Sequence, residues 1–367
     1  MNVVHICRNL AGSTVFPQLF EALAEKGLKQ RVFVPEKTDN NRGKNVPRNV
    51  PTEYAVTLRT SDTLFFHLKA ARTVPWIQSC MGPEETDLIH AHTLFTDGSI
   101  ARELGRKWNR PFVVTLRYSD VAVIWKYEWH LRPMARTILR EAAGVICLSP
   151  VVREQVIRFL PESEQASLAD KCRVIPNGLD PAWLEGARAR TMPTGPVRVG
   201  FAGGMNRRKR PMDALAAVHL ADAGEGRFVF TGCGAGKLEP QVRGKLHPGD
   251  SLKGRIEGRA DMSAFYESCD VLLVPSSAET FGMVYLEAMS RGVPVLYTRG
   301  QGFDGQFPEG EVGFSVGCGN RREQAARLRQ ILEGYEERSR RCIRHAGEYV
   351  WPRITDRFMA AYLSALE

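Results

Sequence analysis

The stretch PSSAETFGMVYLEAMSRGVP, residues 275–294, contains most of the information about the fold. It lies between two short apolar runs, residues 271–274 and 295–297, which are typical of buried strands. The residues between them have the pattern of a loop followed by a helix, and Gly292 and Pro294 mark where that helix stops. The stretch therefore predicts a strand, a loop, a helix and a second strand in succession.

The loop before this helix is a candidate ligand site. We expect the helix to begin near Thr280, which leaves the backbone N–H groups of Phe281 and Gly282 free in its first turn. Free N–H groups and the helix dipole together favour an anion such as a diphosphate. Glu279 stands just before that turn and Glu287 lies eight residues later, a helical span of about 12 Å.

The same alternation of short apolar runs and helical patterns extends over the whole chain. The runs are 2–7, 31–35, 54–58, 87–92, 112–116, 145–149 and 173–176, then 197–202, 227–231, 251–256, 270–275, 294–297 and 313–316. Alternation of this kind is typical of βαβ units and parallel sheets. We predict two doubly wound, Rossmann-like α/β domains facing a central cleft, with ligands at the carboxyl ends of the strands. The expected bounds are 1–178 and 197–345, joined by a Pro- and Gly-rich linker over 179–196.

Composition restricts the function classes. The net charge of +9 is spread without a basic block, so nucleic-acid binding is not expected. The 8 cysteines are scattered singly, which argues against a zinc site or a redox motif and favours reduced thiols in the cytoplasm. Neither a signal peptide nor an apolar run of about 18 residues is evident.

A pair of glutamates separated by seven residues, in this strand, loop and helix setting, resembles glycosyltransferase family 4. In that family the first glutamate lies beside the transferred sugar and the second binds the nucleotide ribose, roles that the resemblance gives to Glu279 and Glu287. The resemblance covers nearly the whole chain. It implies the GT-B fold, an acceptor-binding first domain, a donor-binding second domain, and transfer with retention of configuration.

The segment FAGGMNRRKRPMD, residues 201–213, is where the family places an Arg and a Lys against the donor diphosphate. Here Asn206 occupies the usual Arg position, so we assign Lys209 to the diphosphate, with Arg207 or Arg208 as a substitute. A solvated basic turn is the alternative. Gly204 belongs to the same turn.

Two glycine-bearing turns complete the expected donor site. Gly232 and Gly234 stand in FTGCGAGK, residues 230–237, and either contact the nucleotide or form a tight structural turn. Gln301 and Gly302 follow the strand at 294–297, in a turn that lies near the donor in the family.

The first domain departs from the usual family pattern and resembles a subgroup of family 4 with Arg-x-x-Asp in place of the His-Gly-x-Asp motif. At TLRYSD, residues 115–120, Arg117 and Tyr118 replace a common His-Gly pair, while Asp120 is retained. Arg117 stays protonated and cannot act as a general base, so it would stabilise the diphosphate charge or bind an anionic acceptor. Asp120 would orient Arg117 or the donor sugar.

Four other residues are expected on the acceptor side. Gly12 and Ser13 occupy the place of a glycine loop found in relatives, and Asn177 precedes the linker as part of a hinge. His92 is expected to face the cleft while His90 is packed. The two histidines lack neighbouring carboxylates at ligand spacing, so no metal is expected.

Two segments have an expected packing role. Residues 63–76 are amphipathic and basic, which fits either a membrane-contacting helix or a core-facing one. The resemblance implies that residues 350–367 cross back to pack on the first domain.

We therefore expect a retaining glycosyltransferase without cofactor or metal, in the cytoplasm or at the inner face of the membrane. Its donor would be a UDP- or GDP-sugar and its acceptor a glycan or lipid-linked molecule, in the synthesis of a glycan, a cell-envelope polysaccharide or a glycoconjugate. Two alternatives are an epimerase or hydrolase of sugar nucleotides with the same fold, and a catalytically silent nucleotide-sugar-binding partner.

Overall fold

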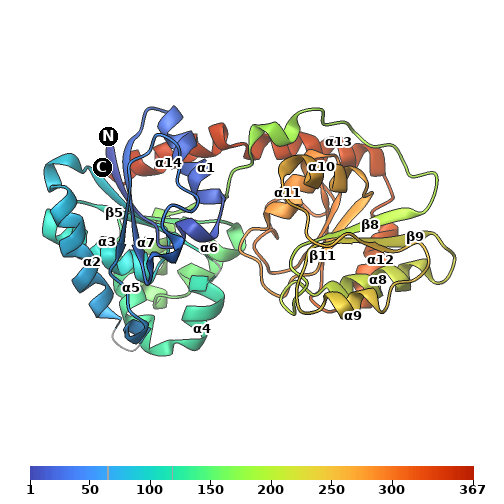
Figure 1. The fold of residues 1–367 in the computed structure, drawn as a ribbon, viewed down its shortest axis with the longest axis horizontal. Coiled ribbons are helices and arrows are strands. Elements are labelled where there is room, and N and C mark those ends of the chain that lie inside the picture. Colours follow the sequence, from blue (N-terminus) through green and yellow to red (C-terminus); the bar gives the residue numbers. More distant parts are fainter. Residues whose placement is uncertain (64–65, 118) are drawn as a thin grey trace. The chain divides into compact units, whose positions relative to one another are not determined.

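The computed structural model describes residues 1–63, 66–117 and 119–367. The chain forms two compact units (Figure 1). Unit 1 contains Met1–Gly178 and Trp351–Glu367, and unit 2 contains Leu179–Val350. Residues 179–196, expected as a linker, contain the 3-10 turn Pro181–Leu184 and no named strand, and are part of unit 2.

Unit 1 is built on a seven-stranded parallel sheet with the order β3-β2-β1-β4-β5-β6-β7. Its strands are β1 (Asn2–Ile6), β2 (Lys29–Glu36), β3 (Thr52–Val56), β4 (Leu88–Ala91), β5 (Phe112–Leu116), β6 (Gly144–Cys147) and β7 (Cys172–Val174). The strand order reverses between β1 and β4, which is where open α/β sheets bind ligands.

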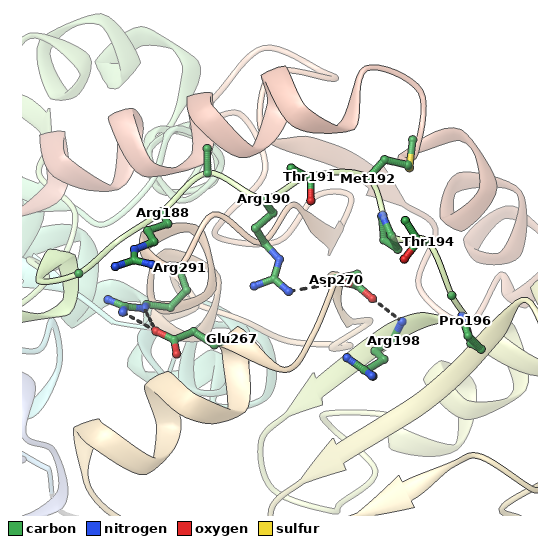
Figure 2. A pocket seen from close by; sticks show the side chains of 14 residues that line it. Arg188, Arg190, Thr191, Met192, Thr194, Pro196, Arg198, Glu267, Asp270 and Arg291 are labelled. Carbon is green, nitrogen blue, oxygen red and sulfur yellow. Dashed lines mark hydrogen bonds and ion pairs between the residues drawn. The ribbon is translucent and has the colours of Figure 1, made fainter.

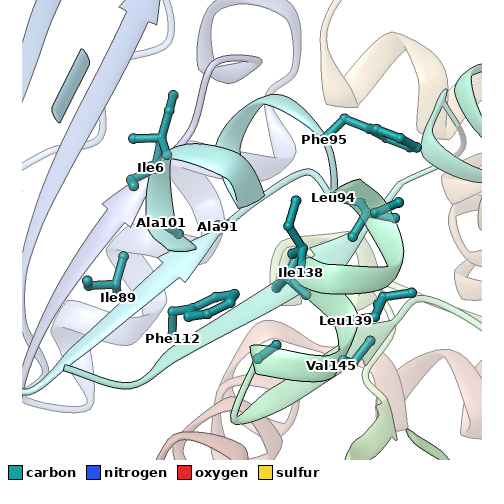
Figure 3. Packing of buried hydrophobic residues seen from close by; sticks show 14 of the residues in the cluster. Ile6, Ile89, Ala91, Leu94, Phe95, Ala101, Phe112, Ile138, Leu139 and Val145 are labelled. Carbon is teal, nitrogen blue, oxygen red and sulfur yellow. The ribbon is translucent and has the colours of Figure 1, made fainter. Parts of the chain in front are cut away.

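The helices of unit 1 cover both faces of this sheet. They are α1 (Val15–Glu25), α2 (His67–Cys80), α3 (Thr96–Trp108), α4 (Trp125–Tyr127), α5 (Arg132–Glu141), α6 (Pro150–Ile157), α7 (Glu162–Lys171) and α14 (Trp351–Ser364). Successive strand residues point to opposite faces, so Val4 and Ile6 join the core under α2, α3 and α5, while Val3 joins the core under α1 and α14. Figure 3 shows the first of these cores, with Phe112 of β5 beside Ile138 of α5.

Unit 2 has a six-stranded parallel sheet with the order β10-β9-β8-β11-β12-β13. Its strands are β8 (Val197–Ala202), β9 (Phe228–Cys233), β10 (Ser251–Leu252), β11 (Val271–Val274), β12 (Val295–Thr298) and β13 (Gly313–Val316). Its helices are α8 (Pro211–Asp222), α9 (Glu239–Arg243), α10 (Arg259–Glu267), α11 (Met283–Ser290), α12 (Arg321–Gln330) and α13 (Tyr335–Ala346). Helices α10, α11 and α13 cover one face and α8 and α12 the other (Figure 1).

The two sheets confirm the predicted pair of Rossmann-like domains. Each expected apolar run overlaps one strand, because short β-branched runs that are buried on both faces carry a clear signal in parallel sheets.

The amphipathic segment at residues 63–76 packs into the core of unit 1. Phe66, Ala70 and Val74 of this segment are buried with residues of α3 and α5. Leu64 and Phe65 lie outside the described residues. The described part of the helix therefore faces the core, and its buried apolar side chains are not available to a membrane. No helix within the described ranges combines the length and hydropathy needed to span a membrane.

The last helix, α14, belongs to unit 1 although it follows unit 2 in the sequence. Trp351 is buried at its start, and its indole Nε1 donates a hydrogen bond to Gln18 Oε1 of α1 at 2.9 Å. Gly178 lies directly against the indole, because a Cβ atom there would come within 2.2 Å of the ring. Tyr362 is also buried, whereas Leu363 is exposed.

The burial of Trp351 gives a stability prediction. Trp351→Ala should lower the free energy of unfolding of unit 1 by about 3–5 kcal/mol, because it leaves a large cavity between α14 and α1. Differential scanning calorimetry measures the loss as a lower transition temperature. Arg353→Ala, an exposed change on the same helix, is the control and should cost less than about 0.5 kcal/mol. Equal transition temperatures for the two variants would contradict the role of α14 in unit 1.

Candidate functional site

The loop after β11 holds Glu279, and its geometry differs from the sequence expectation. Helix α11 begins at Met283 and not near Thr280. Gly282 has a left-handed backbone with φ of +89°, which interrupts the helical path before Met283. Phe281 is buried and its ring contacts those of Phe303 and Tyr349. The expected helical turn is therefore a loop, with Phe281 as its core anchor.

Glu279 is fixed by contacts on its backbone and on its carboxylate. Gln301 Oε1 accepts a hydrogen bond from Glu279 N at 2.9 Å, and Gly302 N donates to Glu279 O at 2.8 Å. Lys209 Nζ forms an ion pair with Glu279 Oε2. Both charged side chains are largely buried, at 12% and 13% exposure, so water screens the pair only weakly. The predicted sugar-side carboxylate and the predicted diphosphate cation thus meet in unit 2.

The loop that carries Lys209 follows β8 and is tied to the Glu279 loop. Asn206 Oδ1 accepts a hydrogen bond from Lys209 N at 3.0 Å, so this amide orders the turn. Arg208 Nη1 donates to Ala278 O at 3.0 Å, and Arg208 O accepts from Ser277 N at 2.8 Å. Arg207 is exposed, and its side chain forms no hydrogen bond or ion pair with the described residues. Arg208 therefore joins the loops, while Lys209 presents its ammonium to the carboxylate.

Glu287 lies on α11 with a buried partner that sequence reasoning missed. Tyr266 of α10 donates a hydrogen bond from its hydroxyl to Glu287 Oε2 at 2.8 Å. Burial raises the pKa of the Glu287 carboxyl, and the hydrogen bond from Tyr266 and the charge of Lys209 oppose that rise. One carboxylate oxygen is thereby held by the protein. Tyr266 stands in an ordinary amphipathic helix, so no sequence signal pointed to it.

The glycine-bearing turns allow close backbone contacts at the ends of β8 and β9. A Cβ atom at Gly234 would lie 1.9 Å from Gly203 O, and one at Gly232 would lie 2.7 Å from the Leu252 side chain. Next to Gly204, Met205 N donates to Ala235 O at 3.0 Å, which joins the two turns. The geometry supports the tight-turn interpretation of Gly232 and Gly234.

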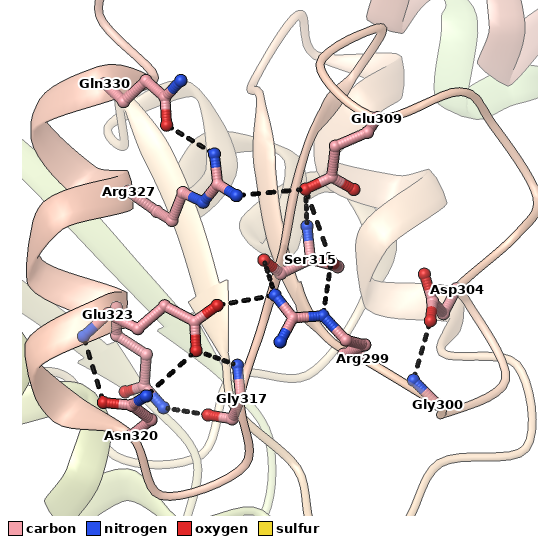
Figure 4. Close-up of polar contacts among 11 residues, drawn as sticks. Arg299, Gly300, Asp304, Glu309, Ser315, Gly317, Asn320, Glu323, Arg327 and Gln330 are labelled. Carbon is pink, nitrogen blue, oxygen red and sulfur yellow. Dashed lines mark hydrogen bonds and ion pairs between the residues drawn. The ribbon is translucent and has the colours of Figure 1, made fainter.

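A polar network supports the turn that carries Gln301 and Gly302 (Figure 4). Arg299 donates hydrogen bonds to Ser315 Oγ at 3.3 Å and to Glu323 Oε1 at 2.6 Å. Across the turn, Gly300 N donates to Asp304 Oδ2 at 2.7 Å. Gly302 then packs so tightly that a Cβ atom would lie 1.7 Å from Thr280 O. The contact of Gln301 with the Glu279 backbone identifies it as a residue that positions Glu279.

In unit 1, Arg117 follows β5 and is held from two sides. Arg117 Nη1 donates to Asn177 Oδ1 at 3.0 Å, and the guanidinium carbon lies 4.6 Å from the centre of the Phe16 ring. Asp120 Oδ2 accepts from Arg117 N at 2.8 Å, so Asp120 fixes the backbone of Arg117. Tyr118 lies outside the described residues. Arg117, Asp120 and Asn177 thus form one group within unit 1.

Two buried carboxyl groups lie near Arg117. Burial raises the pKa of Asp120 to about 6, against hydrogen bonds from the backbone of Arg117 and Leu94. Burial also raises the pKa of Asp97 to about 7, although Thr93 and the backbone of Arg8 oppose the rise. Asp97 stands in the first turn of α3 and was not selected from the sequence, since a lone Asp at a helix start is common.

His90 and His92 are both fully buried, so the expectation that His92 faces the cleft is wrong. The residues point to one face of β4, where His90 contacts Tyr362 Oη and Thr115 Oγ1, each at 2.7 Å. His92 Nε2 lies 3.1 Å from His5 Nδ1. Burial lowers the pKa of all three imidazoles, to about 3 for His5. Both nitrogens of His90 are committed to protein partners, which fits a neutral packed cluster better than a metal site.

Gly12 and Ser13 lie in a short loop after β1. Gly12 is exposed, and a Cβ atom there would meet nothing within 4 Å. Ser13 Oγ accepts a hydrogen bond from Val15 N at 3.3 Å at the start of α1. No hydrogen bond joins either residue to Arg117 among the described residues, and their acceptor role stays a prediction.

A cavity of about 650 Å³ lies at the opposite edge of the unit 2 sheet (Figure 2). It is lined by residues 188–196 and by residues at the amino ends of β8 and β11. Arg190 pairs with Asp270 at 3.4 Å, and Arg291 forms an ion pair with Glu267. Because Glu279 and Lys209 follow the carboxyl ends of the strands, this cavity is separate from the candidate donor site.

Comparison with known proteins identifies relatives for both halves of the chain. Residues 12–183 match the model of Glycosyltransferase Family 4, and residues 188–348 match the model of Glycosyl transferases group 1. A D-inositol 3-phosphate glycosyltransferase of Acidothermus cellulolyticus is 26% identical over 98% of this chain and 87% of its own length.

Solved structures share the fold along nearly the full chain. Anabaena HepE in complex with UDP and glucose is 18% identical, with a TM-score of 0.70 over 99% of this chain and 100% of its own. Sucrose-phosphate synthase from Thermosynechococcus elongatus is 18% identical, with a TM-score of 0.76 over 99% of this chain and 98% of its own.

The tight contact at Gly302 yields a testable prediction. Gly302→Ala should destabilise unit 2 by about 2 kcal/mol or more, because the new methyl group overlaps the Thr280 carbonyl and pushes the Glu279 loop away. Urea denaturation measures the loss. Gly195→Ala, where a Cβ atom meets nothing within 4 Å, is the control. Equal stabilities would show that the two loops are not packed as described.

The raised pKa of Asp97 predicts a pH-dependent stability. Asp97 ionises near pH 3.8 in the unfolded chain and near 7 in the native one, so between these values only the native state keeps its proton. Stability therefore falls as pH rises through this window, by up to about 1.4 kcal/mol per pH unit. Asp97→Asn lacks this loss, so its stability should rise relative to wild type from pH 4.5 to 6.5, as measured by urea denaturation. Parallel pH profiles would contradict the prediction.

Proposed function

The chain belongs to the glycosyltransferases with the GT-B fold that the group 1 and family 4 models describe, and we propose that it moves a sugar with retention of configuration from a UDP- or GDP-sugar to an acceptor hydroxyl. The observation that carries the proposal is the cluster of Lys209, Glu279, Glu287 and Tyr266 within unit 2. The acceptor would be a glycan or a lipid-linked molecule. The eight free, mostly buried cysteines support a cytoplasmic location.

Lys209 would neutralise the charge of the donor diphosphate. Its ammonium is already desolvated and faces a carboxylate, and a diphosphate offers it more negative charge than Glu279 does. Glu279 would then be free to bind the hydroxyl groups of the transferred sugar. Glu287 would bind the ribose with the oxygen that Tyr266 leaves free.

The proton of the acceptor hydroxyl would leave with the donor phosphate. As the bond between the sugar and the diphosphate breaks, the leaving phosphate oxygen gains negative charge and can accept that proton. The proposal assigns diphosphate neutralisation to a Lys side chain and needs no metal ion. Among the described residues, the three-member group of metal-ligand type, His5 with His90 and His92, contains neither Glu279 nor Lys209.

Arg117 and Asp120 of unit 1 would help to bind the acceptor or to stabilise the charge of the diphosphate. The Arg117 guanidinium retains donors that are not used by Asn177, and Asp120 holds its backbone in place. Arg117 replaces a histidine of the family pattern, which motivates the alternative of a silent nucleotide-sugar-binding protein. An epimerase or hydrolase would use the same donor site without an acceptor.

The proposal is tested by turnover and binding with a panel of UDP-, GDP- and ADP-sugars. One donor should bind and release its nucleoside diphosphate slowly. Glu279→Gln should lower the rate about 100-fold with little change in donor affinity, because it removes a contact to the reacting sugar. Glu287→Gln should weaken donor binding about tenfold, because it removes a charged hydrogen-bond acceptor.

Glu257→Gln is the control, since this exposed glutamate pairs only with the exposed Arg255 among the described residues. Binding without any turnover, with or without acceptors, would favour the silent protein. Conversion of the donor to an epimer, or rapid hydrolysis that no acceptor diverts, would favour the second alternative. If no donor binds, the proposal fails.

A further inference from the structure

Lys69 of α2 is a buried cation with no acidic partner among the described residues. Its side chain is 7% exposed, and Nζ donates one hydrogen bond, to Thr96 Oγ1 at 3.2 Å. The ammonium also lies 3.4 Å from the centre of the Phe66 ring. Neither partner carries a negative charge. Because burying an ammonium without an ion-pair partner is costly, Lys69 lowers the stability of the folded chain.

Asp62, an acidic neighbour of Lys69, already binds other groups. Asp62 pairs with Arg72 through one carboxylate oxygen and accepts a hydrogen bond from Arg59 N at 2.7 Å through the other. The negative charges of Asp62 and Glu128 raise the pKa of Lys69, but neither carboxylate forms an ion pair with its ammonium among the described residues.

A second cation, Arg8, lies close to Lys69. Burial lowers the pKa of Lys69 to about 8, and the positive charge of Arg8 is the next largest cause. Arg8 follows β1, and its backbone N–H donates to Asp97 Oδ1 at 3.3 Å, which fixes it beside the start of α3. Its guanidinium forms no hydrogen bond or ion pair with any described side chain. Two cations, neither of them in an ion pair with a described residue, therefore lie near the start of α3.

The position of these cations is that of a ligand site. Arg8 follows β1 and Thr96 follows β4, so both lie at the carboxyl edge of the unit 1 sheet, where the strand order reverses. Thr96 begins α3, a helix of 13 residues whose dipole adds positive potential at this end. Burial raises the pKa of the neighbouring Asp97 to about 7, so about half of its carboxyl groups are protonated at neutral pH.

We propose that Lys69, Arg8 and the amino end of α3 bind a phosphate group of the acceptor, so that the acceptor is a phosphorylated molecule and not a neutral glycan. This inference rests on the proposed transferase function and specifies the substrate class of its first domain. A dianionic phosphate would supply the missing counter-charge for both cations and accept hydrogen bonds from each. The phosphate would belong either to a soluble phosphate ester or to a lipid headgroup.

The test is a calorimetric titration of glycerol 3-phosphate, and of glycerol, into the chain saturated with UDP. UDP occupies the phosphate-binding part of the donor site, so the signal reports a second site. Glycerol 3-phosphate should bind and glycerol should not. Lys69→Met and Arg8→Gln should each weaken binding at least tenfold and leave UDP affinity unchanged. Lys107→Met, an exposed change at the far end of α3, is the matched control and should bind like wild type.

Vesicles identify the source of the phosphate. Cosedimentation with vesicles containing phosphatidic acid, lost in Arg8→Gln, assigns the site to a lipid headgroup, whereas binding of glycerol 3-phosphate alone assigns it to a soluble ester. Lys69→Met should also raise the thermal transition temperature of unit 1, because an uncharged methionine avoids the cost of burying an ammonium. If Lys69 had only a structural role, the same substitution would lower that temperature. If Lys69→Met fails to fold, the affinity of Arg8→Gln for glycerol 3-phosphate decides whether the site binds phosphate.

The inference is overturned if glycerol 3-phosphate binds no better than glycerol, or if Arg8→Gln binds it as tightly as wild type. Loss of phosphate binding with UDP binding intact would reject this inference alone. Failure to bind any nucleotide would instead reject the proposed function.

Discussion

Parallel strand pairing is the constraint on which both candidate sites depend. All the strand pairs described in the two sheets run parallel, so each sheet sends the loops that follow its strands to a single edge. In unit 2 this edge collects Lys209 after β8, Glu279 after β11 and Gln301 after β12. In unit 1 it collects Arg8 after β1 and Arg117 after β5. The strand topology therefore brings charged residues that are distant in the sequence to the same edge of a sheet.

The loops of unit 2 are held by their backbones before any ligand is present. Gly234 approaches Gly203, and Gly302 approaches Thr280, at distances that only glycine permits. The side chains of Lys209 and Glu279 are then brought into an ion pair with little water around it. Electrostatic preorganisation of this kind reduces the reorganisation that binding or reaction would otherwise require.

The sequence allowed the strands and the two-domain plan to be predicted, because strand periodicity is a local pattern. The roles of Glu279, Glu287 and Lys209 come from the family resemblance and stay predictions. The start of α11 could not be placed, since the left-handed backbone of Gly282 depends on the packing of its loop. Tyr266 and Lys69 were missed for another reason. Their importance comes from partners on other elements, and no pattern around either residue records those contacts.

The placement of α14 has a consequence for biosynthesis. Trp351 and Tyr362 of α14 complete the core under α1, and the Tyr362 hydroxyl contacts His90 of β4. These residues are translated after all of unit 2, so until they are made the sheet face that bears Val3 and His5 is covered by α1 without α14. Unit 1 therefore cannot complete this core until the whole of unit 2 has been synthesised.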